Sequence, residues 1–247
     1  MKIIISPAKK MVVEEGIAPY GEPVFLDKTA EIMRYIKTLS YEEAKYLWKC
    51  NDKIAQVNFE RFQDMNLKRN LSPAVLSYEG IQYQYMAPGV MEGEPLAWLQ
   101  EHLRILSGFY GILKPLDGIV PYRLEMQAKA GVKDTKNLYE FWGSDLYKEL
   151  TKDDHVILNL ASKEYAKCIE AFLTEEDTFV TCVFAENVNG KLVQKGTLAK
   201  MARGEMTRFL AETGAKTVED AKKFAGLGFV YSREESGERE YVFIKNS

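Results

Sequence analysis

Apolar positions along the chain follow two periods, which together predict strands alternating with helices. The apolar run III at 3–5 and the mostly apolar run HVILNLA at 155–161 are typical of strands buried on both faces of a sheet. Ser40 and Ser162 stand where the N-caps of two helices belong. A 3.6-residue period predicts helices at 27–38, 41–49, 51–63, 95–103, 138–150, 163–173, 197–211 and 217–224.

The remaining strands are predicted from shorter apolar runs and from turn residues. The clearest turn is NVNG at 187–190, between two runs that would pair as a hairpin. No repeat or linker interrupts the chain, so residues 1–247 are expected to form a single domain of the α/β (α+β) class, a mixed β-sheet flanked by helices. The predicted strands are 75–78, 105–106 with 108–113 as strand or extended loop, 178–186 with 191–195, and 228–233 with 239–245.

Composition narrows the classes of function. The net charge is −3 and the pI is near 5.7, so binding to nucleic acid would require a local basic patch. No apolar run suits a signal peptide or a membrane span, and we expect a cytoplasmic protein with no membrane partner. The three cysteines lack CxxC spacing and the two histidines are isolated, so we expect buried thiols at Cys168 and Cys182, no metal site and no cofactor.

Four segments break the packing pattern, and each carries a cation. The first is SPAK at 6–9, directly after a predicted strand. Ser6 and Pro7 resemble the cap and first residue of a helix, whose free N–H groups would hold an anion together with Lys9. The alternative is a plain turn from strand to loop.

The second segment, SGFYGILKPLDGIVPYRLEM at 107–126, shows neither period for long. Its three glycines and two prolines suit a fixed loop that costs little entropy to hold as the wall of a site. Lys114 and Arg123 would contact phosphate there. The rings that would stack on a base or a sugar are Phe109, Tyr110 and Tyr122.

The same segment also permits a purely structural interpretation. Arg123 and Glu125 lie two residues apart, so in an extended chain they share one face. An internal ion pair of Arg123 with Glu125 or Asp117 would satisfy the guanidinium without any ligand.

The third segment, NLASKEY at 159–165, connects a buried strand to a helix. Ligands of open α/β sheets bind just outside the carboxyl ends of strands, which is where Ser162, Lys163 and Glu164 stand. The alternative is ordinary helix capping by Ser162 with Lys163 in solvent.

The fourth segment, KMARGEMTR at 200–208, lies in the predicted helix 197–211. At 100° per residue, Lys200, Arg203 and Arg208 fall opposite the apolar face, with Gly204 between them. A glycine inside a helix costs about 1 kcal/mol relative to alanine, so something is expected to approach the backbone there. A solvated basic face is the alternative.

Four cation-bearing interruptions in an acidic chain suggest one shared anionic partner. None of them is a phosphate-binding P-loop, a GxGxxG turn or an HExxH zinc motif. Together, and in this order, the blocks ISPAK, LSGFYGILKPLDGIVPYRLEM, LYEFWG, NLASKEY and KMARGEMTRF resemble the YaaA family of peroxide stress resistance proteins, over nearly the whole chain.

The resemblance implies a mixed α/β domain with a basic cleft, located in the cytoplasm. It also implies a role in limiting damage by hydrogen peroxide and iron, and binding of DNA. Contacts made mainly to phosphate would give that binding, to duplex or single-stranded DNA, low sequence specificity. A helix-hairpin-helix-like element would lie at 40–63, although the usual hairpin glycines are missing. Carried over by position, the cleft cations would be Lys9, Arg104, Lys114, Arg123, Lys163, Lys200, Arg203 and Arg208.

Three functions remain open at this point. A protective DNA-binding protein would grip phosphates with the cations above, helped by Ser6 and Ser162. An enzyme would act in the same cleft on a nucleotide, a nucleic-acid base or another small anion, with Tyr122, Glu125 and Glu164 as candidate catalytic residues. Iron sequestration is disfavoured, because no His, Cys or carboxylate ligands cluster in the sequence.

Overall fold

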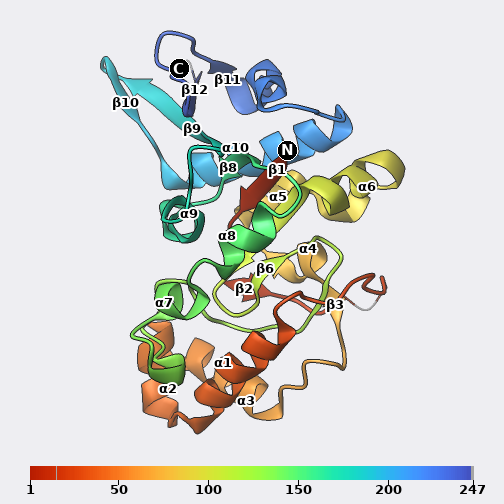
Figure 1. Cartoon of the computed structure of the whole chain (residues 1–247), viewed down its shortest axis with the longest axis vertical. Coiled ribbons are helices and arrows are strands. Elements are labelled where there is room, and N and C mark those ends of the chain that lie inside the picture. Colours follow the sequence, from red (N-terminus) through yellow and green to blue (C-terminus); the bar gives the residue numbers. More distant parts are fainter. Residues whose placement is uncertain (15, 246–247) are drawn as a thin grey trace.

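A mixed sheet of eight strands forms the centre of the computed structural model, which describes residues 1–14 and 16–245 (Figure 1). Its strands are β1 (Lys2–Ile5), β5 (Leu103–Ser107), β6 (Gly111–Leu113), β8 (Val156–Leu160), β9 (Thr178–Val188), β10 (Lys191–Val193), β11 (Phe229–Tyr231) and β12 (Glu240–Lys245). They follow the order β11-β12-β9-β8-β1-β5-β6, with β10 paired to β9. The five strands from β12 to β5 are parallel to one another, and β6, β10 and β11 are antiparallel to their neighbours.

Two smaller ladders and the helices complete the fold, and the mixed α/β class predicted from the sequence is confirmed. The ladders pair β2 (Lys10–Met11) with β4 (Tyr78–Glu79), and β3 (Ser72–Pro73) with β7 (Gly118–Ile119). The α-helices are α1 (Leu26–Thr38), α2 (Tyr41–Trp48), α3 (Asp52–Asp64), α4 (Ala74–Ser77), α5 (Ile81–Met86), α6 (Gly93–His102), α7 (Leu138–Trp142), α8 (Asp145–Leu150), α9 (Lys163–Glu170) and α10 (Gly196–Glu212). Short 3₁₀ helices are Pro88–Val90, Val132–Asp134, Val218–Lys223 and Gly226–Gly228.

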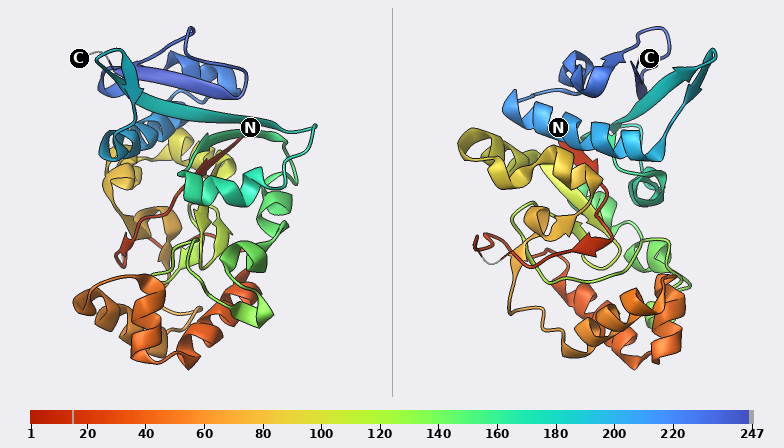
Figure 2. Two further views of the ribbon diagram at one scale, coloured as in Figure 1. Left: turned by 90° about the vertical axis from the view of Figure 1, so that its left-hand side faces the viewer. Right: turned by 180° about the vertical axis from the view of Figure 1, so that it is seen from behind.

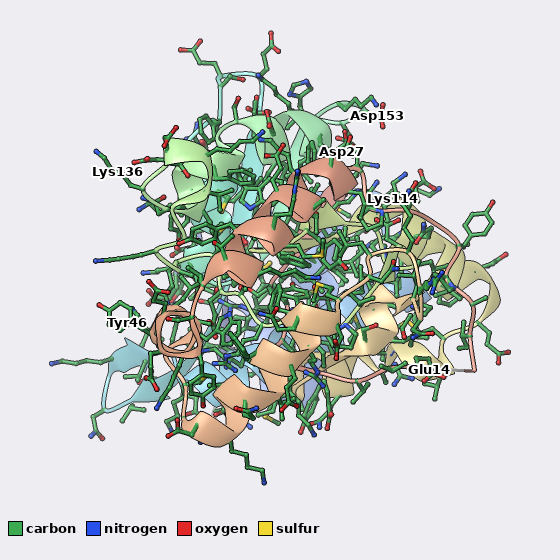
Figure 3. All side chains as sticks on the ribbon, turned by 90° about the horizontal axis from the view of Figure 1, so that it is seen from below. Glu14, Asp27, Tyr46, Lys114, Lys136 and Asp153 are labelled. Carbon is green, nitrogen blue, oxygen red and sulfur yellow. The ribbon has the colours of Figure 1, made fainter. Side chains whose placement is uncertain are left out.

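The elements separate along the long axis of the molecule. Helices α1, α2, α3 and α7 gather at one end, and β9 to β12 lie at the other, in all three ribbon views (Figures 1 and 2). Seen from below, α1 and α3 run side by side across the helical end (Figure 3). The sheet therefore extends from β6, in the middle of the molecule, to the end opposite these helices (Figure 1).

The middle of the sheet is fully buried. Ile3, Ile4 and Ile5 of β1 are all 0% exposed, and β1 is flanked on both sides by parallel strands. A parallel strand covered on both faces needs apolar residues at every position, which explains the unbroken apolar run at 3–5.

Three predicted elements differ from the structure. The predicted strand at 75–78 is wrong: residues 74–77 form one helical turn, because Ser77 Oγ donates to the Pro73 carbonyl at 2.9 Å and the N–H groups of Ala74 and Val75 donate to the 115–117 loop. The helix predicted at 138–150 is broken by Gly143, whose φ of 50° lies in the left-handed region. Residues 218–223 form a 3₁₀ helix in place of an α-helix.

Candidate functional site

A pocket of about 380 Å³ lies beside the carboxyl ends of β1 and β8, and residues from all four cation-bearing segments line it. The chain passes from β1 to β5 on one side and later to β8 on the other, so the strand order reverses at this point. Side chains from the loops after adjacent parallel strands converge at such a reversal. The fold thus places the sequence-predicted residues in one concave site.

The loops after β1 and β8 are held together by one serine. Ser6 Oγ accepts the Ser162 N–H at 2.8 Å and lies 3.2 Å from Ser162 Oγ, while Tyr83 donates to the Ser6 carbonyl at 3.0 Å. Residues 6–9 form a loop, so the plain turn is confirmed, and the alternative of a helix that begins at Ser6 and Pro7 is wrong. Ser162 stands at the N-cap of α9 as predicted, but its side chain faces Ser6 and makes no capping bond.

Glu125 sits between two cations at the pocket. Its Oε1 lies 3.0 Å from Arg123 Nη2 and 3.1 Å from Lys9 Nζ. The side chains of Arg123 and Glu125 are only 11% and 12% exposed, whereas that of Lys9 is 66% exposed. The ion pair of Arg123 with Glu125 is confirmed, and Asp117 instead accepts the backbone N–H of Lys114.

Helices α5 and α10 form another wall, and they meet at a glycine. A Cβ atom on Gly204 would lie 2.0 Å from the Gln82 carbonyl oxygen, so the close approach predicted at Gly204 is made by the backbone of α5 and not by a ligand. This contact brings Gln82 beside Lys200 and Arg203 in the pocket lining. Burial lowers the pKa of Arg203 and is the main cause of that shift.

Three buried nitrogen atoms in this lining have no hydrogen-bond partner among residues 1–14 and 16–245. They are Nε of Arg123, Nε of Arg203 and Nε2 of Gln82, out of five such side-chain atoms in that part of the chain. Gln82 is 7% exposed. Buried donors are almost always satisfied in folded proteins, so these three free donors make the pocket a candidate site for a hydrogen-bond acceptor.

A second carboxyl group and a tyrosine complete the polar lining. Glu164 Oε1 accepts the Gln127 N–H at 3.2 Å, and burial, reinforced by the neighbouring Glu125 charge, raises the pKa of Glu164. The Tyr122 hydroxyl lies 2.8 Å from that of Tyr78, and burial raises the pKa of Tyr122 to about 12. Tyr122 therefore keeps its proton at neutral pH and acts as a hydrogen-bonding group.

Four of the predicted cations lie outside this pocket. Arg104 and Lys114 line a separate cavity of about 360 Å³, and Figure 3 labels Lys114. Arg208 forms an ion pair with Glu212 at 2.7 Å and borders a different hollow. Lys163 is exposed at the first position of α9, next to the pocket but not in its lining.

Two of the rings expected to stack on a ligand belong to the core. Phe109 and Tyr110 are both 0% exposed, so the expectation that they contact a ligand is wrong. Phe109 packs edge-on against Phe62 of α3, with ring centroids 5.4 Å apart. Only Tyr122 of the three predicted rings lines the pocket.

Sequence reasoning missed the contribution of α5. Gln82 and Tyr83 enter the pocket from a short helix that no cation marks. The available signal was two glutamines and two tyrosines in the six residues of Ile81–Met86, too many polar groups for a plain core helix.

The helix pair predicted at 40–63 is present as α2 and α3. Lys49 adopts a left-handed φ of 46° between them, and Asn51 caps α3 by accepting the Ile54 N–H at 3.0 Å. The buried thiols are also confirmed, with Cys168 at 4% and Cys182 at 1% exposure. Residues 1–14 and 16–245 hold no group of three or more His, Cys, Asp or Glu side chains suited to a metal ion, and no helix there is long and apolar enough to span a membrane.

Known sequences resemble the chain over its full extent. The family model described as peroxide stress protein YaaA matches residues 1–235. A UPF0246 protein of Lachnoclostridium phytofermentans is 58% identical over 246 residues, which span 99% of this chain and 96% of the relative. UPF0246 proteins of Agathobacter rectalis and Pediococcus pentosaceus are 54% and 52% identical, over 98% and 100% of this chain and 98% of each relative. The resemblance carried by the sequence motifs is therefore confirmed, and the chain belongs to the family of the peroxide stress protein YaaA.

Proposed function

We propose that this member of a peroxide stress family works by binding a phosphate-bearing partner in the pocket, and that the partner is DNA bound with low sequence specificity. The observation that carries the proposal is the set of unsatisfied buried donors on Arg123, Arg203 and Gln82. Phosphate oxygens are among the strongest acceptors for guanidinium groups, which bind them through parallel hydrogen bonds. We expect the protein to act in the cytoplasm.

The charges of the lining favour an anion. Five cations face three carboxylates there. Lys10 is paired with Glu79 at 2.7 Å, and Glu125 neutralises its own neighbours. Lys200 and Arg203 form no ion pair with any residue of 1–14 and 16–245, so their charge is available to a ligand.

The size of the pocket limits how DNA would bind. A cavity of about 380 Å³ is in the range of small-molecule sites and is far too narrow for a duplex. One phosphate or one nucleotide would enter, and exposed lysines at its edge, such as Lys9 and Lys163, would meet the neighbouring backbone. Phosphate contacts do not read sequence, which accounts for the low specificity.

The test is binding of duplex and single-stranded oligonucleotides at several salt concentrations. We expect wild-type affinity to fall steeply with salt and the variant Lys200→Ala/Arg203→Ala to lose most binding, with a salt slope smaller by about 2. Arg208→Ala is the matched control, because it removes a cation from the same helix outside the pocket. Binding that ignores the double substitution, or that Arg208→Ala reduces equally, would refute the proposal.

An enzyme is the second candidate, favoured by the two glutamates. Glu125 is ion-paired, whereas the pKa of Glu164 is raised by burial, and carboxyl groups in such different environments are suited to opposite roles in acid–base chemistry. Glu125→Gln separates the candidates, because it should spare oligonucleotide binding but abolish turnover. The measurement is a screen of nucleotides and other small phosphorylated compounds for conversion by the wild-type protein and by this variant.

A further inference from the structure

We propose that the unit bound in the pocket is a nucleoside phosphate, with its phosphate at Lys200 and Arg203 and the polar edge of its base or sugar at Glu164 and Tyr165. This inference rests on the proposed function and deepens it by naming the group that enters. It gives Glu164 and Tyr165 a role in recognising the base or sugar, a role that binding of a simple anion would not require.

The ionic groups of the pocket that lack an ion pair belong to two different helices. Lys200 and Arg203, in α10, form no ion pair with any carboxylate of residues 1–14 and 16–245. Glu164, in α9, forms no ion pair with any cation of the same residues, whereas Glu125 is already paired. A ligand that contacts both helices therefore needs an anion at one end and hydrogen-bond donors at the other.

Tyr165 offers a free donor next to Glu164. It lines the pocket and is 6% exposed, yet no acceptor among residues 1–14 and 16–245 takes its hydroxyl proton. The neighbouring Tyr83 hydroxyl, by contrast, is occupied by the Ser6 carbonyl. The Tyr165 oxygen is not among the fully buried side-chain atoms that lack a partner, so it is accessible at the pocket, where a ligand would accept its proton.

Counting protons on a buried hydroxyl chain yields a second donor. Ser107 Oγ accepts the N–H groups of Phe109 and Tyr110 at 3.1 and 2.9 Å, so its own proton goes to Tyr122, 2.6 Å away. One hydrogen bond joins the hydroxyls of Tyr122 and Tyr78, and it uses only one of their two protons. The other proton is free. An acceptor bound in the pocket would favour the arrangement in which Tyr122, which lines the pocket, carries this free proton.

The rest of the lining suits a flat ring. The aromatic rings of Tyr83, Tyr122 and Tyr165 line the pocket together with Ile81 and Leu124. An inorganic phosphate would leave this apolar surface uncovered, whereas a nucleobase covers it and presents donors and acceptors at its edge. The lining therefore selects a nucleoside phosphate over a bare oxyanion.

Calorimetric titration with single compounds tests the inference. The probes are inorganic phosphate, ribose 5-phosphate and the four ribonucleoside 5′-monophosphates. We expect at least one nucleotide to bind about tenfold more tightly than inorganic phosphate and ribose 5-phosphate, since the base adds buried apolar area and hydrogen bonds. If no nucleotide exceeds inorganic phosphate, the inference is overturned.

Two conservative variants test where the polar edge of the base or sugar binds. Tyr165→Phe and Glu164→Gln should each weaken nucleotide binding about 5- to 20-fold and leave inorganic phosphate unchanged. Tyr139→Phe is the control, because it removes a hydroxyl that donates to the Glu164 carbonyl at 2.9 Å from outside the pocket lining. Thermal unfolding midpoints confirm that each variant is folded. Nucleotide affinity that survives both pocket substitutions contradicts the inference.

The two proposals fail in different ways. In one outcome, oligonucleotides bind in a salt-dependent way that Lys200→Ala/Arg203→Ala abolishes, but mononucleotides do not bind. This result refutes the nucleoside phosphate and supports the proposed function. Insensitivity of all phosphorylated probes to that double substitution refutes the proposed function itself.

Discussion

The contact between α5 and α10 makes Gly204→Ala a sharp test of how the pocket wall is built. The added Cβ would lie 2.0 Å from the Gln82 carbonyl oxygen and 3.0 Å from the Met86 nitrogen. Both atoms belong to backbone, so no side chain can rotate away. The helices must separate by roughly 1 Å to restore van der Waals contact.

The magnitude follows from two opposing effects. Overpacking of this kind costs about 3 kcal/mol at the upper end of its range, because helix α10 is buried at this point. Replacing a helical glycine by alanine returns about 1 kcal/mol. The free energy of unfolding should therefore fall by about 2 kcal/mol, which lowers the midpoint of thermal unfolding by about 4–8 °C in a chain of this size.

The assay is thermal and urea unfolding of Gly204→Ala beside Gly196→Ala. Gly196 begins the same helix, and nothing lies within 4 Å of the Cβ that alanine would add there. We expect Gly196→Ala to be neutral or slightly stabilising. We also expect Gly204→Ala to weaken oligonucleotide binding, since Gln82 and Arg203 stand at the strained contact. An unchanged or raised midpoint for Gly204→Ala would show that the helices do not meet at this glycine.

Two further predictions concern buried charges. Burial raises the pKa of Asp117 from 3.8 to about 6. The contribution of its protonated form to the free energy of unfolding is therefore full below pH 3.8 and is lost as the pH rises through about 6. Urea unfolding of the wild type should lose up to about 3 kcal/mol between about pH 4 and pH 7, and Asp117→Asn should lack that loss; equal profiles would contradict it. Arg203→Met removes a buried charge that has no carboxylate partner in residues 1–14 and 16–245. It should raise the midpoint of thermal unfolding by about 2–4 °C and weaken oligonucleotide binding about tenfold. A lowered midpoint would contradict this prediction.

The parts of the fold that could be predicted are those where one long pattern decides the outcome. The apolar run of β8 and the 17-residue helix α10 have such patterns. The strand predicted at 75–78 is wrong because the local preference for a strand is overridden by backbone hydrogen bonds to Pro115 and Asp117, which are distant in sequence.

The candidate site was predictable by segment but not by side chain. The four cation-bearing segments do meet at the pocket, since strand order brings their ends together. Lys114 and Arg208 lie elsewhere because the direction of each side chain depends on packing that a sequence does not display. Phe109 is buried by Phe62, a contact made across 47 positions, and Gln82 carries no charge that would mark it.

The position of β1 in the sheet has a consequence for how the protein becomes active. Ile3 pairs with Leu103 on one side and with Leu158 on the other, so the two loops that Ser6 joins come from distant parts of the chain. Closing such long loops is slow, and the pairing forms only after residues 156–160 have been synthesised. The pocket is thus a late product of folding. A ligand that binds the folded pocket stabilises the whole sheet, because an unfolded or incomplete chain does not contain the pocket.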